Sequence, residues 1–79
     1  MPITVRLFAS IRRYQPQLAP GEKLSLEILP HATVSQILDR LGIPVRAAAI
    51  TMVNGRVQRP DRVLSDEDVL SVFPPVAGG

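Results

Sequence analysis

The sequence predicts a single α+β domain in which one helix covers one face of a mixed β-sheet, followed by a short extended tail. Three observations support this prediction. The length of 79 residues suits one compact domain. Several short segments alternate apolar and polar residues, whereas one segment has helical spacing. Two prolines then separate the last alternating segment from small terminal residues. We therefore divide the chain into a domain at 1–73 and a tail at 74–79.

The first two strands are expected at 3–9 and 23–29, where apolar residues alternate along the chain. The apolar faces consist of Ile3, Val5 and Leu7 in the first segment and Leu24, Leu26 and Ile28 in the second. Residues 10–22 contain two prolines and a glycine, so they are expected to form a loop or broken turn. The two strands would then form a hairpin.

One amphipathic helix should follow. Thr33 and Gln36 have the spacing of a capping box, in which each side chain bonds the backbone N–H of the other residue. Gly42 and Pro44 are expected to end the helix. The apolar residues at helical spacing are Val34, Ile37, Leu38 and Leu41.

Three further strands complete the order. The apolar, β-branched segment 47–53 leads into Asn54-Gly55, a strong signal for a tight hairpin turn into 56–58. Residues 69–73 alternate again, and the prolines at 74 and 75 end the ladder because proline has no N–H donor. The order strand, strand, helix, strand, strand, strand is that of the β-grasp fold.

Composition excludes several classes of function. The chain has no cysteine, which rules out disulfides and thiolate metal sites, and its one histidine, His31, is expected at the surface or as a cap, with no metal bound. No apolar run is long enough to span a membrane, and the N-terminus is too short and polar for a secretory signal, so the expected location is cytoplasmic. A net charge of only +2, scattered arginines and few aromatics argue against nucleic acid binding.

The ending PPVAGG carries the functional signal. Pro74 and Pro75 favour a stiff, extended backbone, and Val76 and Ala77 add only small side chains. The final pair, Gly78-Gly79, has no Cβ and can pass a channel too narrow for any side chain. We expect this tail to project from the domain and to present the Gly79 carboxylate to another protein. The bland alternative is a frayed end without chemistry.

Four stretches carry a resemblance to a known family: the opening VRLFASIR, the Asn54-Gly55 turn, the acidic lead SDEDV and the ending VFPPVAGG. The chain resembles the small subunit of molybdopterin synthase and the thiamine-pathway sulfur carrier, both members of the ubiquitin-like β-grasp superfamily. The ending is more similar to the molybdopterin branch. Glu67 stands where the family usually has a glycine, so that turn is expected to adopt a different conformation.

The resemblance implies a sulfur carrier that binds no cofactor stably and is not catalytic on its own. An E1-like adenylating enzyme would use ATP to convert the Gly79 carboxylate to an acyl adenylate, and a sulfur donor would turn it into a thiocarboxylate. The large subunit of molybdopterin synthase would then receive the tail. General acids and bases would come from the partner, because the tail contains none.

A docking face is also expected. Phe8 and Phe73 are out of phase with the apolar faces of their strands, so both should point away from the helix. If these strands are adjacent, the two rings form an aromatic patch at the base of the tail, and residues 74–77 would bind the partner with them. The alternatives are a covering loop or a phase shifted by one residue. The arginines that could pair with an acidic partner, or simply be solvated, are Arg6, Arg12, Arg13, Arg56 and Arg59.

Three other functions remain open. A ubiquitin-like modifier would join Gly79 to a lysine of a target protein, and a thiamine-pathway carrier would share the thiocarboxylate chemistry. A β-grasp interaction module would have no chemistry at all. Lys23 is the only lysine, which would restrict chain building on the protein itself and slightly favours the carrier.

Overall fold

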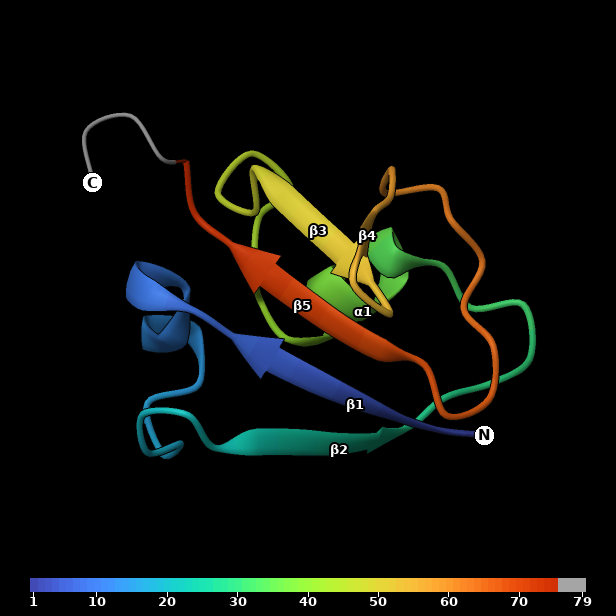
Figure 1. Cartoon of the computed structure of the whole chain (residues 1–79), viewed down its shortest axis with the longest axis horizontal. Helices are drawn as coiled ribbons and strands as arrows, with labels where there is room; N and C mark the ends of the chain where they lie inside the picture. Colours follow the sequence, from blue (N-terminus) through green and yellow to red (C-terminus); the bar gives the residue numbers. More distant parts are fainter. Residues whose placement is uncertain (76–79) are drawn as a thin grey trace.

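The computed structural model describes residues 1–75, which form a five-stranded mixed sheet with one α-helix on one face (Figure 1). The strands lie in the order β2-β1-β5-β3-β4. The predicted α+β, β-grasp architecture is confirmed. The elements in chain order are β1 (Pro2–Leu7), the 3-10 helix η1 (Ala9–Tyr14), β2 (Lys23–Glu27), α1 (Val34–Arg40), β3 (Ile50–Val53), β4 (Arg56–Val57) and β5 (Val69–Phe73).

The first and last long strands pair in the middle of the sheet. β1 runs parallel to β5, with Leu7 opposite Val72, and antiparallel to β2, as the predicted hairpin requires. β3 runs antiparallel to both β5 and β4. Because β1 and β5 are parallel, their carboxyl ends meet at one end of the sheet, and Figure 1 shows the chain leaving β5 beside the end of β1.

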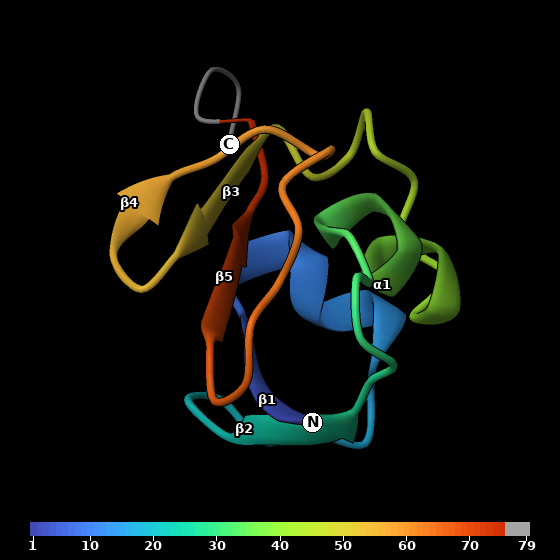
Figure 2. The same ribbon diagram turned by 90° about the vertical axis from the view of Figure 1, so that its right-hand side faces the viewer.

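Helix α1 covers one face of this sheet (Figure 2). The capping box at its N-terminus is present: the Gln36 N–H donates to Thr33 Oγ1 at 3.2 Å, and the Thr33 N–H donates to Gln36 Oε1 at 2.9 Å. The helix buries Val34, Ile37 and Leu38 against the inward residues of the strands, and each such side chain stabilises the fold by about 1.5 to 3 kcal/mol. The strand residues in this core include Ile3, Val5, Leu7, Val53, Leu70 and Val72.

Three predicted strand boundaries were wrong, one of them the start of the third strand, which lies at Ile50 instead of residue 47 because Ala47 is still part of a turn. The first strand ends at Leu7 instead of residue 9, because Ala9 has a left-handed φ of 53° that turns the chain into η1. The supposed loop at 10–22 therefore begins inside a 3-10 helix, which buries Ile11 in the core. The second strand also ends early, at Glu27, although Ile28 remains buried.

Two turns adopt left-handed backbone conformations. Asn54 and Gly55 have φ values of 53° and 83°, as the tight turn between β3 and β4 requires, so this predicted hairpin is confirmed. Glu67 has a φ of 65° in the turn that precedes β5. This left-handed conformation also suits glycine, and the expected difference from the family's turn stays a prediction.

Within residues 1–75, neither helix combines the length and the apolar character that crossing a bilayer requires. The same part of the chain contains no cluster of three or more histidine, aspartate or glutamate side chains able to hold a metal ion.

Candidate functional site

The candidate site is the end of the sheet from which the tail departs. β5 ends at Phe73 in the centre of the sheet, and Pro74 and Pro75 are the last described residues. The expectations for Val76, Ala77 and Gly78-Gly79 lie outside the described residues and stay predictions. The structure describes the surface around the point where the chain leaves β5, which a partner that binds the tail would contact.

An aromatic pair lies at this base. Phe8 directly follows β1 and Phe73 ends β5, so the parallel pairing of the two strands brings the rings together. Their centroids are 4.4 Å apart and their planes differ by 8°, which is a stacked arrangement. Both rings are partly exposed, whereas their neighbours Leu7 and Val72 are buried in the core. The rings therefore belong to the face of the sheet opposite α1.

An open apolar hollow of about 480 Å³ adjoins the pair. It is lined by Ala9, Ile50, Met52, Val57, Phe73, Pro74 and Pro75. Met52 lies directly opposite Val57 in the β3–β4 ladder, so their side chains share one face of the sheet. Val57 is 70% exposed. Exposed apolar side chains that gather in one patch are typical of protein docking surfaces.

Arginines flank the aromatic pair. The Arg6 guanidinium carbon lies 5.1 Å from the centroid of the Phe8 ring, within the range of a cation–π contact. Arg6 and Arg12 also line a smaller hollow of about 130 Å³ together with Glu22. The Nε of Arg12 is buried and makes no hydrogen bond to any residue from 1 to 75. Guanidinium groups in this position suit a carboxylate brought by a partner.

The remaining candidate residues are Arg13, Arg56, Arg59 and His31. Arg13 is exposed and donates to the Tyr14 hydroxyl at 3.3 Å, and this hydrogen bond raises the pKa of Arg13. Arg56 and Arg59 sit in β4 and just beyond it. His31 is exposed in the loop before α1, with a left-handed φ of 70°. A role in the site does not follow for any of these residues.

The sequence pattern did not identify four of the seven residues that line the hollow, namely Ala9, Ile50, Met52 and Val57. It placed the apolar stretch before Asn54 in a strand but did not assign its faces, so Ile50 and Met52 were not identified as surface residues. The signal was present, because a two-residue Asn-Gly turn fixes the register of the hairpin and sets Met52 across from Val57. Ala9 could not have been found this way, because its place depends on the left-handed turn after β1.

Chemically, the described surface is suited to binding. The hollow itself is lined by apolar residues alone. It therefore offers no general acid, base or nucleophile for a reaction of its own. A partner side chain that fills it would lose apolar surface to solvent, at about 25 cal/mol for each Å² buried.

Comparison with known proteins gives a family and several structural neighbours. The model of the ThiS family matches residues 5–79. The fold is similar to small archaeal modifier protein 1 of H. volcanii (TM-score 0.71, 20% identity, covering 95% of this chain and 98% of that one). It is equally similar to a putative molybdopterin converting factor subunit 1 from Pyrococcus furiosus (TM-score 0.71, 23% identity, coverage 96% and 99%).

A third neighbour was solved as a complex of subunits 1 and 2 of the molybdopterin-converting factor from Helicobacter pylori (TM-score 0.58, 24% identity, both chains fully covered). No curated protein gives a significant sequence match. At these identities the neighbours show the fold alone, whereas the family model spans nearly the whole sequence and reaches Gly79. The chain therefore belongs to the ThiS family.

Proposed function

We propose that this protein is a sulfur carrier whose Gly79 carboxylate is adenylated by a partner enzyme and converted to a thiocarboxylate. We further propose that it acts as the small subunit of a molybdopterin synthase. The observation that carries the proposal is the surface at the root of the tail: Pro74 and Pro75, which begin the tail, also line the apolar hollow. A partner that binds there holds the start of the peptide whose end it must receive.

The chemistry needs two steps. The Gly79 carboxylate attacks the α-phosphate of ATP, forming an acyl adenylate and releasing pyrophosphate. A hydrosulfide sulfur from a donor then attacks the carbonyl carbon to form the thiocarboxylate, and AMP leaves with the electrons of the broken C–O bond. A free carboxylate is a poor electrophile, so the first step supplies the leaving group for the second.

Two further observations support the molybdopterin branch. The sequence VFPPVAGG is more similar to that branch than to the thiamine carriers, and one neighbour is described as subunit 1 of a molybdopterin-converting factor in complex with subunit 2. A large subunit of that kind would dock on the Phe8–Phe73 pair and the hollow. The arginines beside Phe8 favour a partner that carries acidic side chains at this contact.

Intact-mass spectrometry tests the proposal directly. The protein purified from its own host should end at Gly79, and incubation with ATP, a candidate adenylating enzyme and a sulfur source should add the mass of one oxygen-for-sulfur exchange. A variant that lacks Gly79 and a variant extended by one alanine should keep the fold but lose this product. Sulfur transfer by either variant at the normal rate would refute the assignment.

A protein modifier is the second candidate. The fold is as similar to a small archaeal modifier protein as it is to the putative molybdopterin converting factor subunit, with a TM-score of 0.71 for both. The two functions share the adenylate and separate after it. Isopeptide-linked products in the host would identify a modifier, whereas the thiocarboxylate alone would identify a carrier. Lys23, the only lysine of the chain, lies in β2 at the sheet edge away from β3 and β4, so self-conjugation would have a single possible site.

A further inference from the structure

The outer edge of β2 is a strand edge with self-complementary side chains. β2 is the terminal strand of the sheet and pairs only with β1 among residues 1–75. Its sequence is Lys-Leu-Ser-Leu-Glu, from Lys23 to Glu27. An unpaired strand edge exposes backbone donors and acceptors that another strand can bind.

The hydrogen bonds identify which backbone groups face outward. Met1 and Ile28 exchange both of their backbone bonds, with the Ile28 N–H donating to Met1 O at 2.9 Å and the Met1 ammonium donating to Ile28 O at 3.1 Å. In an antiparallel pair such positions alternate with positions that face away from the partner strand. The outward groups of β2 therefore belong to Lys23, Ser25 and Glu27.

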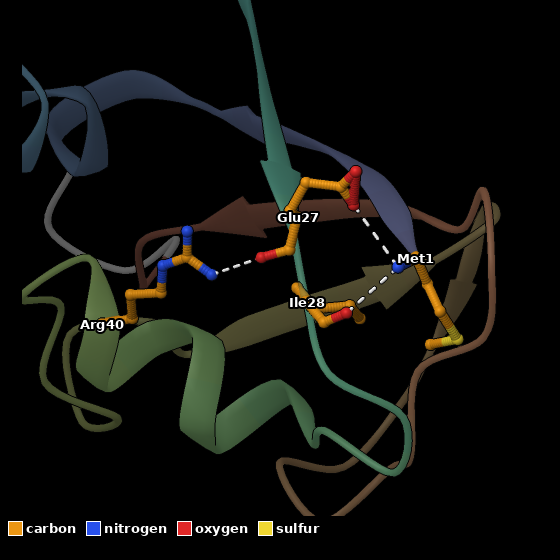
Figure 3. A network of polar contacts seen from close by, with 4 residues as sticks. All are labelled: Met1, Glu27, Ile28 and Arg40. Atoms are coloured by element: carbon orange, nitrogen blue, oxygen red, sulfur yellow. Dashed lines mark hydrogen bonds and ion pairs between the residues drawn. The ribbon is translucent and has the colours of Figure 1, made fainter.

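Figure 3 shows the outward direction at Glu27, where Arg40 of α1 reaches the outer side of β2 and donates to the Glu27 backbone carbonyl at 2.6 Å. On the other side, the Met1 ammonium lies 3.3 Å from the Glu27 carboxylate. The Arg40 contact leaves the edge usable, because a carbonyl oxygen has two lone pairs and can accept a second donor.

We propose that β2 pairs with β2 of a second copy of this chain, antiparallel and with Ser25 on the two-fold axis. In this register Lys23 stands opposite Glu27 of the second copy, and the same pair recurs on the other side of the axis. Each outward-facing residue then exchanges both backbone hydrogen bonds with its opposite. An interface of this kind is isologous and closes at two copies.

The side chains agree with this register on both faces. Directly opposed residues share a face, so Lys23 and Glu27 of the second copy meet on the open face, where both residues are exposed. Leu24 and Leu26 of the second copy meet on the helix side, where both are partly buried against the core. A strand edge with charges of one sign at these positions would repel its copy, whereas this edge attracts it.

The dimer leaves the proposed sulfur chemistry untouched. The hollow is built from β3, β4 and the end of β5, on the other side of β1 from the paired edge. Association through β2 therefore neither needs nor blocks the tail. Dimerisation and the sulfur-carrier function can each be refuted without affecting the other.

Sedimentation equilibrium of the full chain up to about 1 mM tests the pairing, since short strand edges give weak contacts. The wild type should dimerise with increasing concentration. Lys23→Glu and Glu27→Lys should each weaken association about tenfold or more, since each places like charges opposite one another at both ends of the interface. An equimolar mixture of these two variants should associate again, because each charge then meets its opposite.

Ser25→Pro is the backbone control. It removes an N–H that faces away from β1, so circular dichroism should show an intact fold while dimerisation is lost. A wild type that stays monomeric across the concentration range would overturn the proposal. So would single charge reversals that leave association unchanged, or a mixture of the two variants that fails to restore it.

Discussion

The buried carboxylate of Asp68 should make one of the larger side-chain contributions to stability in this protein. Asp68 is 6% exposed and joins two turns: its Oδ1 accepts from Asn54 Nδ2 at 2.8 Å, and its Oδ2 accepts from the Ser65 N–H at 2.7 Å. Asn54 in turn accepts from the Val69 N–H at 2.9 Å. The side chain thus fastens the β3–β4 turn to the start of β5.

Asp68→Ala removes both acceptors and leaves two partly buried donors without a partner. Hydrogen bonds to charged groups contribute about 1.5 to 3 kcal/mol each, and the two losses overlap, so we expect a loss of about 3 kcal/mol in the free energy of unfolding. For a domain of this size that corresponds to a fall of roughly 12 to 24 °C in Tm. Urea and thermal unfolding followed by circular dichroism would measure it.

Asp66→Ala is the matched control, because Asp66 is exposed in the same acidic stretch and should change stability by no more than about 0.5 kcal/mol. A double-mutant cycle with Asn54→Gly, which keeps the left-handed turn, should give a coupling of about 1 kcal/mol or more. If Asp68→Ala were as mild as Asp66→Ala, the hydrogen-bond reasoning would be refuted.

Two further predictions concern the turn before β5 and the docking face. Glu67→Gly should raise the free energy of unfolding by about 1 kcal/mol, because Glu67 has a φ of 65°, while Asp66→Gly should lower it; equal losses in both variants would contradict the strain argument. Phe73→Ala should weaken binding of the large subunit or adenylating enzyme roughly 10- to 100-fold by calorimetry, with Leu29→Ala, exposed in the loop before α1, as the neutral control. Unchanged affinity with the fold retained would remove Phe73 from the interface.

The sequence predicted those elements whose local pattern and tertiary surroundings agree. β5 was placed at its observed bounds because Leu70 and Val72 alternate with polar or outward residues and Pro74 ends the ladder. The helix start followed from the Thr33–Gln36 capping box. β1 was extended too far because Phe8 and Ala9 continue the alternation, and nothing local reveals the left-handed conformation of Ala9.

The candidate site was likewise predicted only where local sequence pattern determines it. The strand phase indicated that Phe8 and Phe73 leave the core face, but their stacking depends on the parallel pairing of β1 with β5, which joins strands from opposite ends of the chain. Asp68 was read only as part of an acidic stretch. Its burial depends on Asn54, which lies fourteen residues earlier and meets it only in the folded sheet.

The position of β5 links stability to the proposed function. This strand is hydrogen-bonded to β1 on one side and to β3 on the other, and the Asn54–Asp68 contact fastens its beginning while the tail leaves from its end. A partner that pulled on the tail would therefore apply force along β5. The backbone hydrogen bonds of β5 to both β1 and β3 would have to break before the domain opened. In the proposed function, the central place of β5 would allow this small domain to present its C-terminus to another protein without unfolding.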